Sequence, residues 1–217
     1  MIGRSAARVA AEVGVDLERT ARDALRRIAG YMDLPITTVS VLVRPRRATP
    51  EIGLGGSTDA RADVSIFVDP AHDDLGAALD VWLPPLLAHE LHHAARIVDG
   101  PGYGESLTEA MVSEGLADAF TLEAFPRTPV PPWTRALGAR ALCRWWQTAR
   151  VESSRAGASY DHAAWFFGAG DVPRWTGYSI GFVLVERYLR EHPAETPASL
   201  LEAPARKIAA GARLCAT

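Results

Sequence analysis

The order of strand-like and helix-like segments is the feature that most limits how this chain of 217 residues can fold. Segments 36–44 and 63–69 alternate β-branched and polar residues, which predicts two strands, and the glycine-rich segment 51–57 predicts a turn or irregular strand between them. Helical spacing of apolar residues predicts helices at 5–30, 75–82, 86–98, 106–124, 134–152 and 178–191, with a shorter helix after Pro197. Early strands followed by helices predict an α+β domain.

The boundaries of the central helices follow from proline and glycine. Pro84-Pro85 is expected to end the helix at 75–82 and to begin the next one, which Asp99-Gly100-Pro101-Gly102 should end. We expect residues 1–217 to form a single domain. It would have an N-terminal helix at 1–35, a core at 36–192 and a helical tail at 193–217.

Composition and charge exclude several classes of function. A net charge of −3, with 48% apolar and 23% charged residues, is typical of an ordinary globular protein and provides no basic field for nucleic acid or acidic membranes. The chain has no apolar stretch of membrane-spanning length and no signal-peptide core at its N-terminus, which predicts a cytoplasmic protein. Cys143 and Cys215 lie far apart and outside any Cys-x-x-Cys pair, which argues against a disulfide framework and a thiolate metal site.

The run His89-Glu90-Leu91-His92-His93 carries the clearest chemical signal. Histidines four residues apart on a helix project from one face, so His89 and His93 can bind one metal ion, and zinc prefers such nitrogen ligands. Glu90 would lie close enough to a metal-activated water to act as its base. His92 is also within reach of His89, but only the 89/93 register places Glu90 correctly, so we interpret His92 as a flanking residue.

A catalytic zinc site takes three protein ligands and leaves one position open for water. Glu105, Glu109 and Glu114 are the nearest downstream carboxylates, and the last two lie about 140° apart around a helix, so both cannot face the metal. Glu114 is favoured because Asp118, one turn later, could accept the free N–H of a metal-binding histidine. Glu109 remains the alternative ligand. Gly115 would allow this helix to approach a neighbour closely.

The sequence resembles known zinc hydrolases at several places. HELHH followed by EGLAD is similar to the sequence pattern of the glutamate zincins, a group that includes the thermolysin-like enzymes. The runs LLAHELHHAAR, SEGLADAF and TGYSIGFVLVERYL resemble a bacterial family of predicted zinc-dependent proteases, over about residues 36 to 192. The resemblance implies a minimal zincin-like fold, in which a small twisted sheet packs on the active-site helix and a mostly helical C-terminal half follows.

The resulting prediction is a zinc metallopeptidase in which His89, His93 and Glu114 bind Zn²⁺, Glu90 is the general base and Asp118 supports a histidine. Tyr178 could stabilise the oxyanion of the reaction or simply pack its ring at a helix start. The expected partner is a peptide or protein substrate, with no nucleic acid and no membrane. A zinc hydrolase of another amide or ester, and a non-catalytic metal-binding or partner-binding module with the same fold, remain alternatives.

Other residues are expected to serve the fold. His72, His162 and His192 should be solvent-exposed, and the aromatic residues of the later half should form core and pocket walls. The glycine-rich segment 53–56 has no phosphate-binding pattern. It could instead let a peptide add to the edge of the sheet.

Overall fold

The computed structural model describes residues 4–153, 160–210, 212, 214 and 215. The chain forms two compact units, the first made of Met1–Asp99 and Phe120–Thr128 and the second of Gly100–Ala119 and Pro129–Thr217. Helix α4 (Leu107–Ala124) contributes residues to both. The predicted α+β class is confirmed, with one small sheet and a mostly helical C-terminal half. The single domain stays a prediction, since two units that share a helix can fold together or separately.

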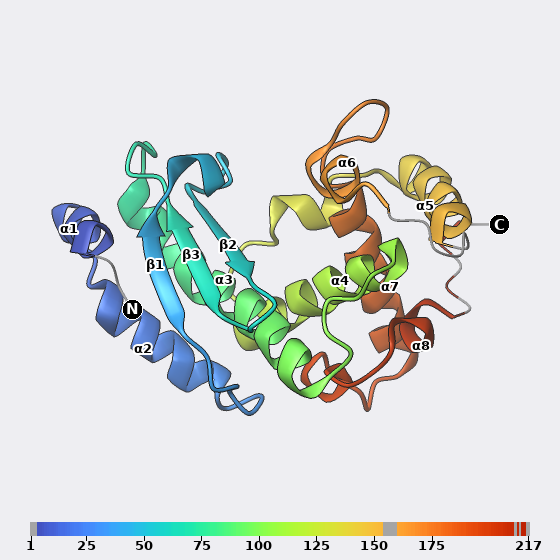
Figure 1. Cartoon of the computed structure of the whole chain (residues 1–217), viewed down its shortest axis with the longest axis horizontal. Helices are drawn as coiled ribbons and strands as arrows, with labels where there is room; N and C mark the ends of the chain where they lie inside the picture. Colours follow the sequence, from blue (N-terminus) through green and yellow to red (C-terminus); the bar gives the residue numbers. More distant parts are fainter. Residues whose placement is uncertain (1–3, 154–159, 211, 213, 216–217) are drawn as a thin grey trace. The chain divides into compact units, whose positions relative to one another are not determined.

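A three-stranded sheet in the order β1-β3-β2 organises the first unit (Figure 1). Strand β1 (Val39–Val43) runs parallel to β3 (Val64–Val68), and β2 (Leu54–Thr58) runs antiparallel to β3. The register places Ile66 of β3 between Val41 and Gly56. The segment expected to be a turn or irregular strand therefore ends in a regular edge strand, β2, after the short 3₁₀ turn η1 (Pro45–Arg47).

The N-terminal segment forms two helices where one was expected. Helix α1 (Arg4–Glu12) ends before Gly14, whose φ of +78° lies in the left-handed region that a continuing helix cannot use. Helix α2 (Leu17–Ile28) begins afresh, with the Asp16 side chain accepting the Arg19 N–H at 3.0 Å. A glycine followed closely by an N-cap residue marks this break, and the apolar spacing alone concealed it.

Helix α3 (Leu75–Asp99) runs without interruption through Pro84 and Pro85, so the predicted break at these prolines is wrong. Proline removes the N–H that would bond the carbonyl four residues earlier, here those of Asp80 and Val81. Both of these residues are exposed, so water can satisfy their carbonyls and the loss of two helix bonds is tolerable. Pro85 is itself buried, and its carbonyl accepts the Thr121 hydroxyl at 3.2 Å.

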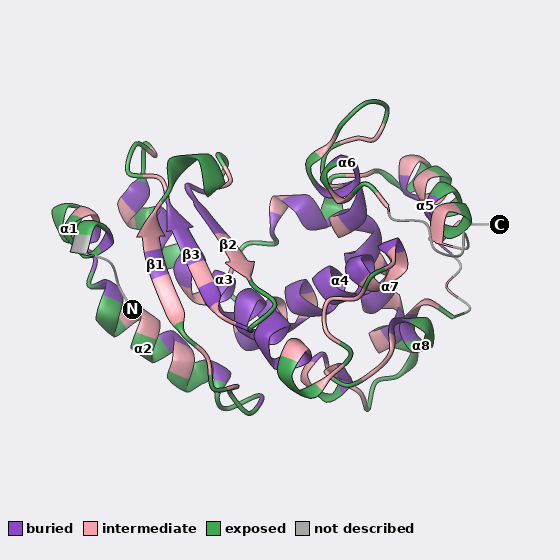
Figure 2. Ribbon diagram, viewed as in Figure 1, coloured by how far each residue is buried: buried purple, intermediate pink, exposed green. Residues whose placement is uncertain are grey.

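Helix α3 is buried without a break from Pro85 to Arg96, which Figure 2 draws in purple, and is exposed at its last two residues. It packs against β2 and β3 and against α2. Leu79, Leu83, Leu87 and Leu91 follow one another at helical spacing and are at most 1% exposed. Burial of such side chains contributes roughly 1.5–3 kcal/mol each. The helix that carries the histidines is therefore a rigid core element of the first unit.

The second unit is helical in its described residues and is built around the crossing of α4 with α7 (Thr176–Glu191). A side chain at Gly115 would overlap the Gly181 carbonyl, and one at Gly181 would overlap the Met111 carbonyl. The close approach expected for Gly115 is thus made to α7. The remaining elements are η2 (Pro132–Arg135), α5 (Ala139–Ser153), α6 (His162–Phe167), η3 (Ala198–Leu200) and α8 (Ala205–Ala209).

The expected aromatic core is confirmed only in part. Trp146, Trp165 and Phe166 are buried in the second unit, whereas Phe167 is 59% exposed. Phe167 is the last residue of α6 and precedes Gly168, whose φ of +85° ends the helix.

Cys143 and Cys215 form a disulfide bond, so the argument from their spacing against a disulfide framework is wrong. Their sequence separation of 72 residues concealed the pairing, because only the fold of the second unit brings the C-terminal segment to α5. Among the residues that the structure describes, none of the helices combines the length and apolar character needed to cross a lipid bilayer.

Candidate metal centre

The two histidines of the motif meet at the buried face of α3. The Nε2 atoms of His89 and His93 lie 3.1 Å apart, and the rings stand edge to face with centroids separated by 4.7 Å. Both residues are buried, as are all the residues of the motif. One turn of helix between them brings the two nitrogens to a common point, which is the geometry that a shared cation requires.

Glu90 lies on the flank of the same helix against the edge strand β2. The Thr58 hydroxyl is within hydrogen-bonding distance of the Glu90 carboxylate at Oε2 (2.7 Å) and of the Glu90 carbonyl (2.9 Å). The other carboxylate oxygen, Oε1, faces Gly56, where any side chain would overlap it. Neither neighbour was predictable from the sequence, because neither is near Glu90 in the chain.

His92 occupies a different environment. Its side chain is fully buried, and its ring lies 5.4 Å from that of Phe120 at an interplanar angle of 37°. Phe120 belongs to the part of α4 that packs in the first unit. The structure therefore places His92 beside Phe120, on a face of α3 that differs from the one bearing His89 and His93.

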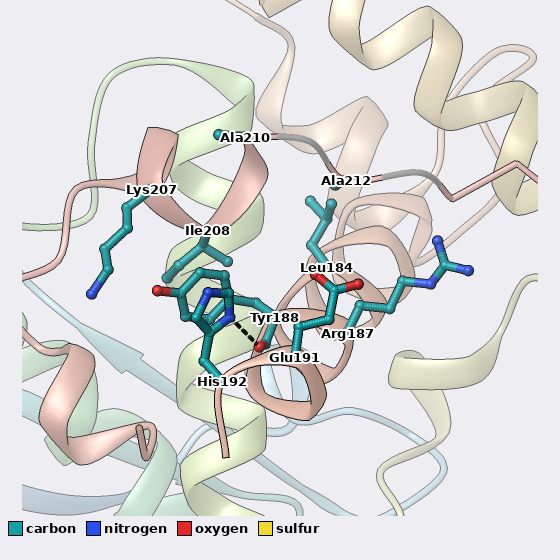
Figure 3. A pocket seen from close by; sticks show the side chains of 9 residues that line it. All are labelled: Leu184, Arg187, Tyr188, Glu191, His192, Lys207, Ile208, Ala210 and Ala212. Carbon is teal, nitrogen blue, oxygen red and sulfur yellow. Dashed lines mark hydrogen bonds between the residues drawn. The ribbon is translucent and has the colours of Figure 1, made fainter. Parts of the chain in front are cut away.

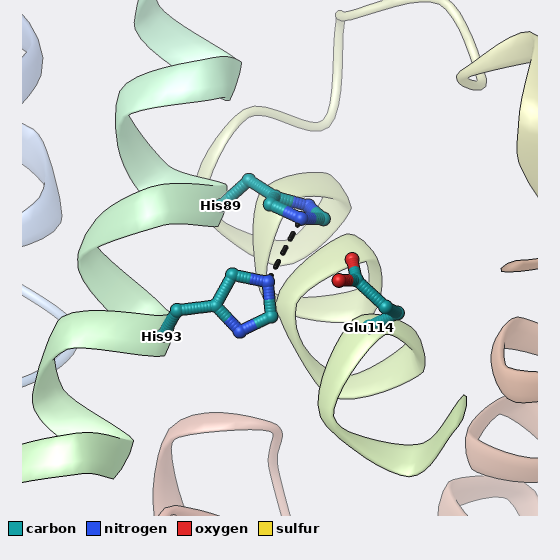
Figure 4. A group of neighbouring side chains, drawn as sticks. All are labelled: His89, His93 and Glu114. Atoms are coloured by element: carbon teal, nitrogen blue, oxygen red, sulfur yellow. Dashed lines mark hydrogen bonds between the residues drawn. The ribbon is translucent and has the colours of Figure 1, made fainter. Parts of the chain in front are cut away.

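Glu114 of α4 completes a group of three buried side chains that could hold a cation. One ligand atom from each of His89, His93 and Glu114 lies within 4.8 Å of the others. Figure 4 shows the two imidazoles and the carboxylate of this group. Within the described part of the chain, this is the set of three or more His, Cys, Asp or Glu residues that meets such a criterion.

Tyr103 contacts the Glu114 carboxylate, and both residues belong to the second unit. Its hydroxyl donates a hydrogen bond to Glu114 Oε1 at 2.9 Å. Burial, and next the negative charge of Glu114, raise the pKa of Tyr103 well above 10. The phenol therefore stays protonated and acts as a donor at neutral pH.

Glu109 contacts different groups from Glu114. Its Oε2 atom accepts hydrogen bonds from the backbone N–H groups of Glu105 (3.1 Å) and Ser106 (2.9 Å) and from the Ser106 hydroxyl (2.8 Å). These groups precede the first residue of α4, where backbone donors lack helical partners. Glu109 thus caps the N-terminus of α4, and Glu105 is exposed beside it.

Asp118 is completely buried one turn beyond Glu114. Its two carboxylate oxygens lie 3.0 and 3.1 Å from Nε1 of Trp133, which donates to them. Trp133 was not among the residues singled out from the sequence, and the buried indole N–H could not have been assigned to an acceptor without the fold. The predicted support of a metal-binding histidine by Asp118 stays a prediction.

Tyr178 lies in the first turn of α7 and is half-buried among aromatic rings. Its ring is 5.0 Å from that of Phe166, edge to face, and 6.2 Å from that of Trp133. Both packing and access to a ligand are therefore compatible with its position, and its assignment as an oxyanion donor stays a prediction.

His162 is half-buried, so the expectation that it is solvent-exposed is wrong. Its ring stacks on Phe166 at 4.5 Å, and its Nδ1 atom lies 3.1 Å from the Tyr160 hydroxyl. Burial lowers the pKa of His162 below 6.5, against the opposing charges of Glu114 and Asp161. Burial likewise raises the pKa of Tyr160 to about 12, so the Tyr160–His162 pair is neutral at pH 7.

The two other histidines outside the motif differ from each other. His72 is half-buried against Gly53, contrary to expectation, whereas His192 is exposed and stacks on Tyr188 at 4.1 Å.

A cavity of about 300 Å³ lies in the second unit between α7 and α8 (Figure 3). Leu184, Tyr188 and Ile208 form part of its lining, and Arg187, Glu191 and Lys207 add charged groups. The Lys207 ammonium is paired with Glu195 at 2.9 Å. None of the predicted site residues lines this cavity, so it is separate from the candidate metal centre.

Comparisons with known proteins agree with the chemistry of this group. Residues 16–210 match the DUF2268 family, which is described as a predicted Zn-dependent protease. The chain is 27% identical over 169 residues to the uncharacterized protein YjaZ of Bacillus subtilis (strain 168), an alignment that covers 76% of this chain. The aligned part spans 62% of the length of YjaZ. No solved structure matches the chain.

Proposed function

The chain belongs to the DUF2268 family of predicted zinc-dependent proteases, and on that premise we propose that it is a zinc-dependent peptidase of the glutamate-zincin type. In this proposal His89, His93 and Glu114 bind the zinc ion and Glu90 is the general base. The observation that carries it is the buried group of two imidazoles and one carboxylate, with the imidazole nitrogens 3.1 Å apart.

The donor set fits zinc. In a tetrahedral site with Zn–N bonds of about 2.0–2.1 Å, two ligand nitrogens lie roughly 3.4 Å apart, close to the separation of the two Nε2 atoms. Two histidines and one glutamate leave one coordination position free, as catalytic rather than structural zinc sites do. Bound there, zinc would polarise a substrate carbonyl and lower the pKa of a water molecule towards neutrality.

Glu90 then has the proton-transfer role. Its carboxylate would take a proton from the attacking water and deliver it to the amine that leaves, so one group serves as base and then as acid. Thr58 orients the carboxylate through Oε2, and Gly56 allows the edge strand to come close enough for this contact. A site with only a structural role needs no such base, and this supports catalysis over a purely metal-binding module.

A polypeptide is the substrate that the surroundings of Glu90 favour. Strand β2 is at the edge of the sheet, and its residues Gly56 and Thr58 lie against the Glu90 carboxylate. An extended peptide could add to this edge through backbone hydrogen bonds, which would bring its carbonyl groups close to Glu90. Tyr178 is the proposed donor to the oxyanion that forms on that carbonyl.

Metal content and hydrolysis test the proposal together. The wild type should bind one zinc ion and cleave an unstructured protein such as casein, or members of a peptide library. Glu90→Gln should bind zinc equally well and lose cleavage, because the amide cannot accept a proton from water. Activity of Glu90→Gln within a few-fold of wild type would contradict the assignment of the base, and a wild type without zinc would contradict the proposal as a whole.

A further inference from the structure

The Tyr103 hydroxyl contacts one carboxylate oxygen of the proposed third ligand. Its hydroxyl donates to Oε1 of Glu114 at 2.9 Å, and the glutamate is only 6% exposed. A carboxylate has two oxygens that can each bind a cation. A hydrogen-bond donor held at one oxygen therefore affects how the carboxylate binds the cation. Tyr103 was not singled out from the sequence, because it lies in the loop between α3 and α4.

The loop holds Tyr103 at a defined place relative to α4. Gly102 and Gly104 flank it with φ values of +72° and +92°, a conformation that other residues rarely adopt. A side chain at Gly104 would overlap that of Glu109, so the loop lies directly against the first turn of the helix. Glu109 in turn accepts the N–H groups of Glu105 and Ser106, which ties the end of the loop to α4.

The position of Tyr103 therefore depends on α4 itself, the helix that carries Glu114. The phenol ring also lies edge to face with His162 at 5.9 Å, which restricts it from another side. Ordering a side chain costs entropy that a single hydrogen bond does not always offset. Here backbone conformation and ring packing have already restricted the side chain before any metal binds.

We propose that Tyr103 is a positioning residue for the zinc site: by holding Oε1 of Glu114, it leaves Oε2 alone to bind the metal. This inference rests on the proposed function. A carboxylate bound through both oxygens would use a coordination position that a catalytic zinc keeps for water or substrate. Hydrogen-bond partners of metal ligands generally orient them in this way, and their loss weakens metal affinity by about 10- to 100-fold.

The chain offers a matched control in Tyr160. This tyrosine lies in the same part of the second unit, and its hydroxyl is 3.1 Å from His162 Nδ1. Tyr160→Phe and Tyr103→Phe each remove one hydroxyl and keep the ring. Only Tyr103→Phe removes the hydrogen bond to Glu114.

Zinc affinity of the full chain, measured by competition with a chromophoric chelator, tests the inference without any substrate. Tyr103→Phe should bind zinc about 10- to 100-fold more weakly than wild type, while Tyr160→Phe binds it as tightly as wild type. Cobalt(II) substitution provides a second readout, since four-coordinate cobalt absorbs visible light more strongly than cobalt of higher coordination. The cobalt band of Tyr103→Phe should be weaker than that of wild type.

The outcomes separate the inference from the proposed function. Unchanged zinc affinity together with an unchanged cobalt spectrum in Tyr103→Phe would overturn the role of Tyr103 and leave the zinc site standing. A wild type that binds neither metal would overturn both. Thermal melting of the metal-free variants checks that the fold is retained, and equal loss of affinity in Tyr160→Phe would also count against a specific role for Tyr103.

Discussion

Glu90 is a buried carboxylate whose two oxygens have different neighbours, a hydroxyl at one and a glycine at the other. A threonine beside a glutamate would be unremarkable on a surface. In a buried setting the hydrogen bond restricts the carboxylate to one orientation, and hydrogen bonds to charged groups contribute roughly 1.5–3 kcal/mol. The free energy of this hydrogen bond is therefore large enough to affect a reaction whose rate depends on the orientation of the base.

Replacing Thr58 tests this contact. Thr58→Val keeps the shape of the side chain and removes the hydroxyl, so kcat should fall about 10-fold or more while KM and zinc content change little. Thr58→Ser keeps the hydroxyl and should retain most of the activity. Steady-state kinetics and metal analysis of the three proteins give the answer. Equal loss in both variants would point to packing rather than to the hydrogen bond.

His92 and His93 are adjacent in sequence and differ in what they contact. His93→Ala should lose most of the bound zinc, because it removes a proposed ligand. His92→Ala should keep the zinc and lower the free energy of unfolding by about 2 kcal/mol, because it leaves a cavity beside Phe120. Metal analysis and chemical denaturation separate the two effects. Equal loss of zinc in both variants would mean that the metal-binding register is wrong.

At the scale of elements, helices α4 and α7 cross with their backbones in contact. Gly115 and Gly181 make this possible, because a methyl group at either position would overlap a backbone carbonyl of the other helix. Backbone atoms cannot turn aside as a flexible side chain can. The position of Glu114, one residue before Gly115, is thus coupled to how closely these two helices approach.

Gly181→Ala should lower the free energy of unfolding by about 1–3 kcal/mol, because the two helices must move apart to admit the methyl group. Gly138→Ala is the matched control, since a side chain there would meet no atom within 4 Å and its φ is not in the left-handed region. Urea denaturation measures both. A Gly181→Ala protein as stable as the control would show that the crossing is looser than the structure implies.

At the scale of the whole molecule, the disulfide joins α5 to the C-terminal segment across 72 residues. Disulfides persist mainly in oxidising compartments, and this pairing therefore does not favour the cytoplasmic location that we predicted because the sequence shows no signal-peptide core and no apolar stretch of membrane-spanning length. A cross-link over a loop of this length restricts the unfolded chain strongly. The chain-entropy relation gives about 4 kcal/mol of stabilisation.

Breaking the disulfide tests this contribution. Reduction with dithiothreitol should lower the melting temperature of the wild type, because the unfolded chain regains the conformations that the cross-link removed. A Cys143→Ser, Cys215→Ser double variant should melt at the temperature of the reduced wild type and should not respond to dithiothreitol. A wild type whose melting temperature is unaffected by reductant would contradict the pairing or its effect on stability.

Local physics made part of this protein predictable from its sequence. The order of strands and helices and the one-turn separation of His89 and His93 depend on backbone geometry and residue propensity, which act over a few residues. The division of the N-terminal helix was also locally encoded, by Gly14 and Asp16, although apolar spacing obscured it.

Only the tertiary structure decided the features that depend on distant contacts. Whether α3 could continue through two prolines depended on which carbonyls face water. The different environments of Glu109 and Glu114 depended on a helix start and a buried group, and the partners of Glu90 and Asp118 came from an edge strand and from Trp133. A sequence pattern specifies which residues share a helix face, but the neighbours of that face are chosen by the free energy of packing the whole chain.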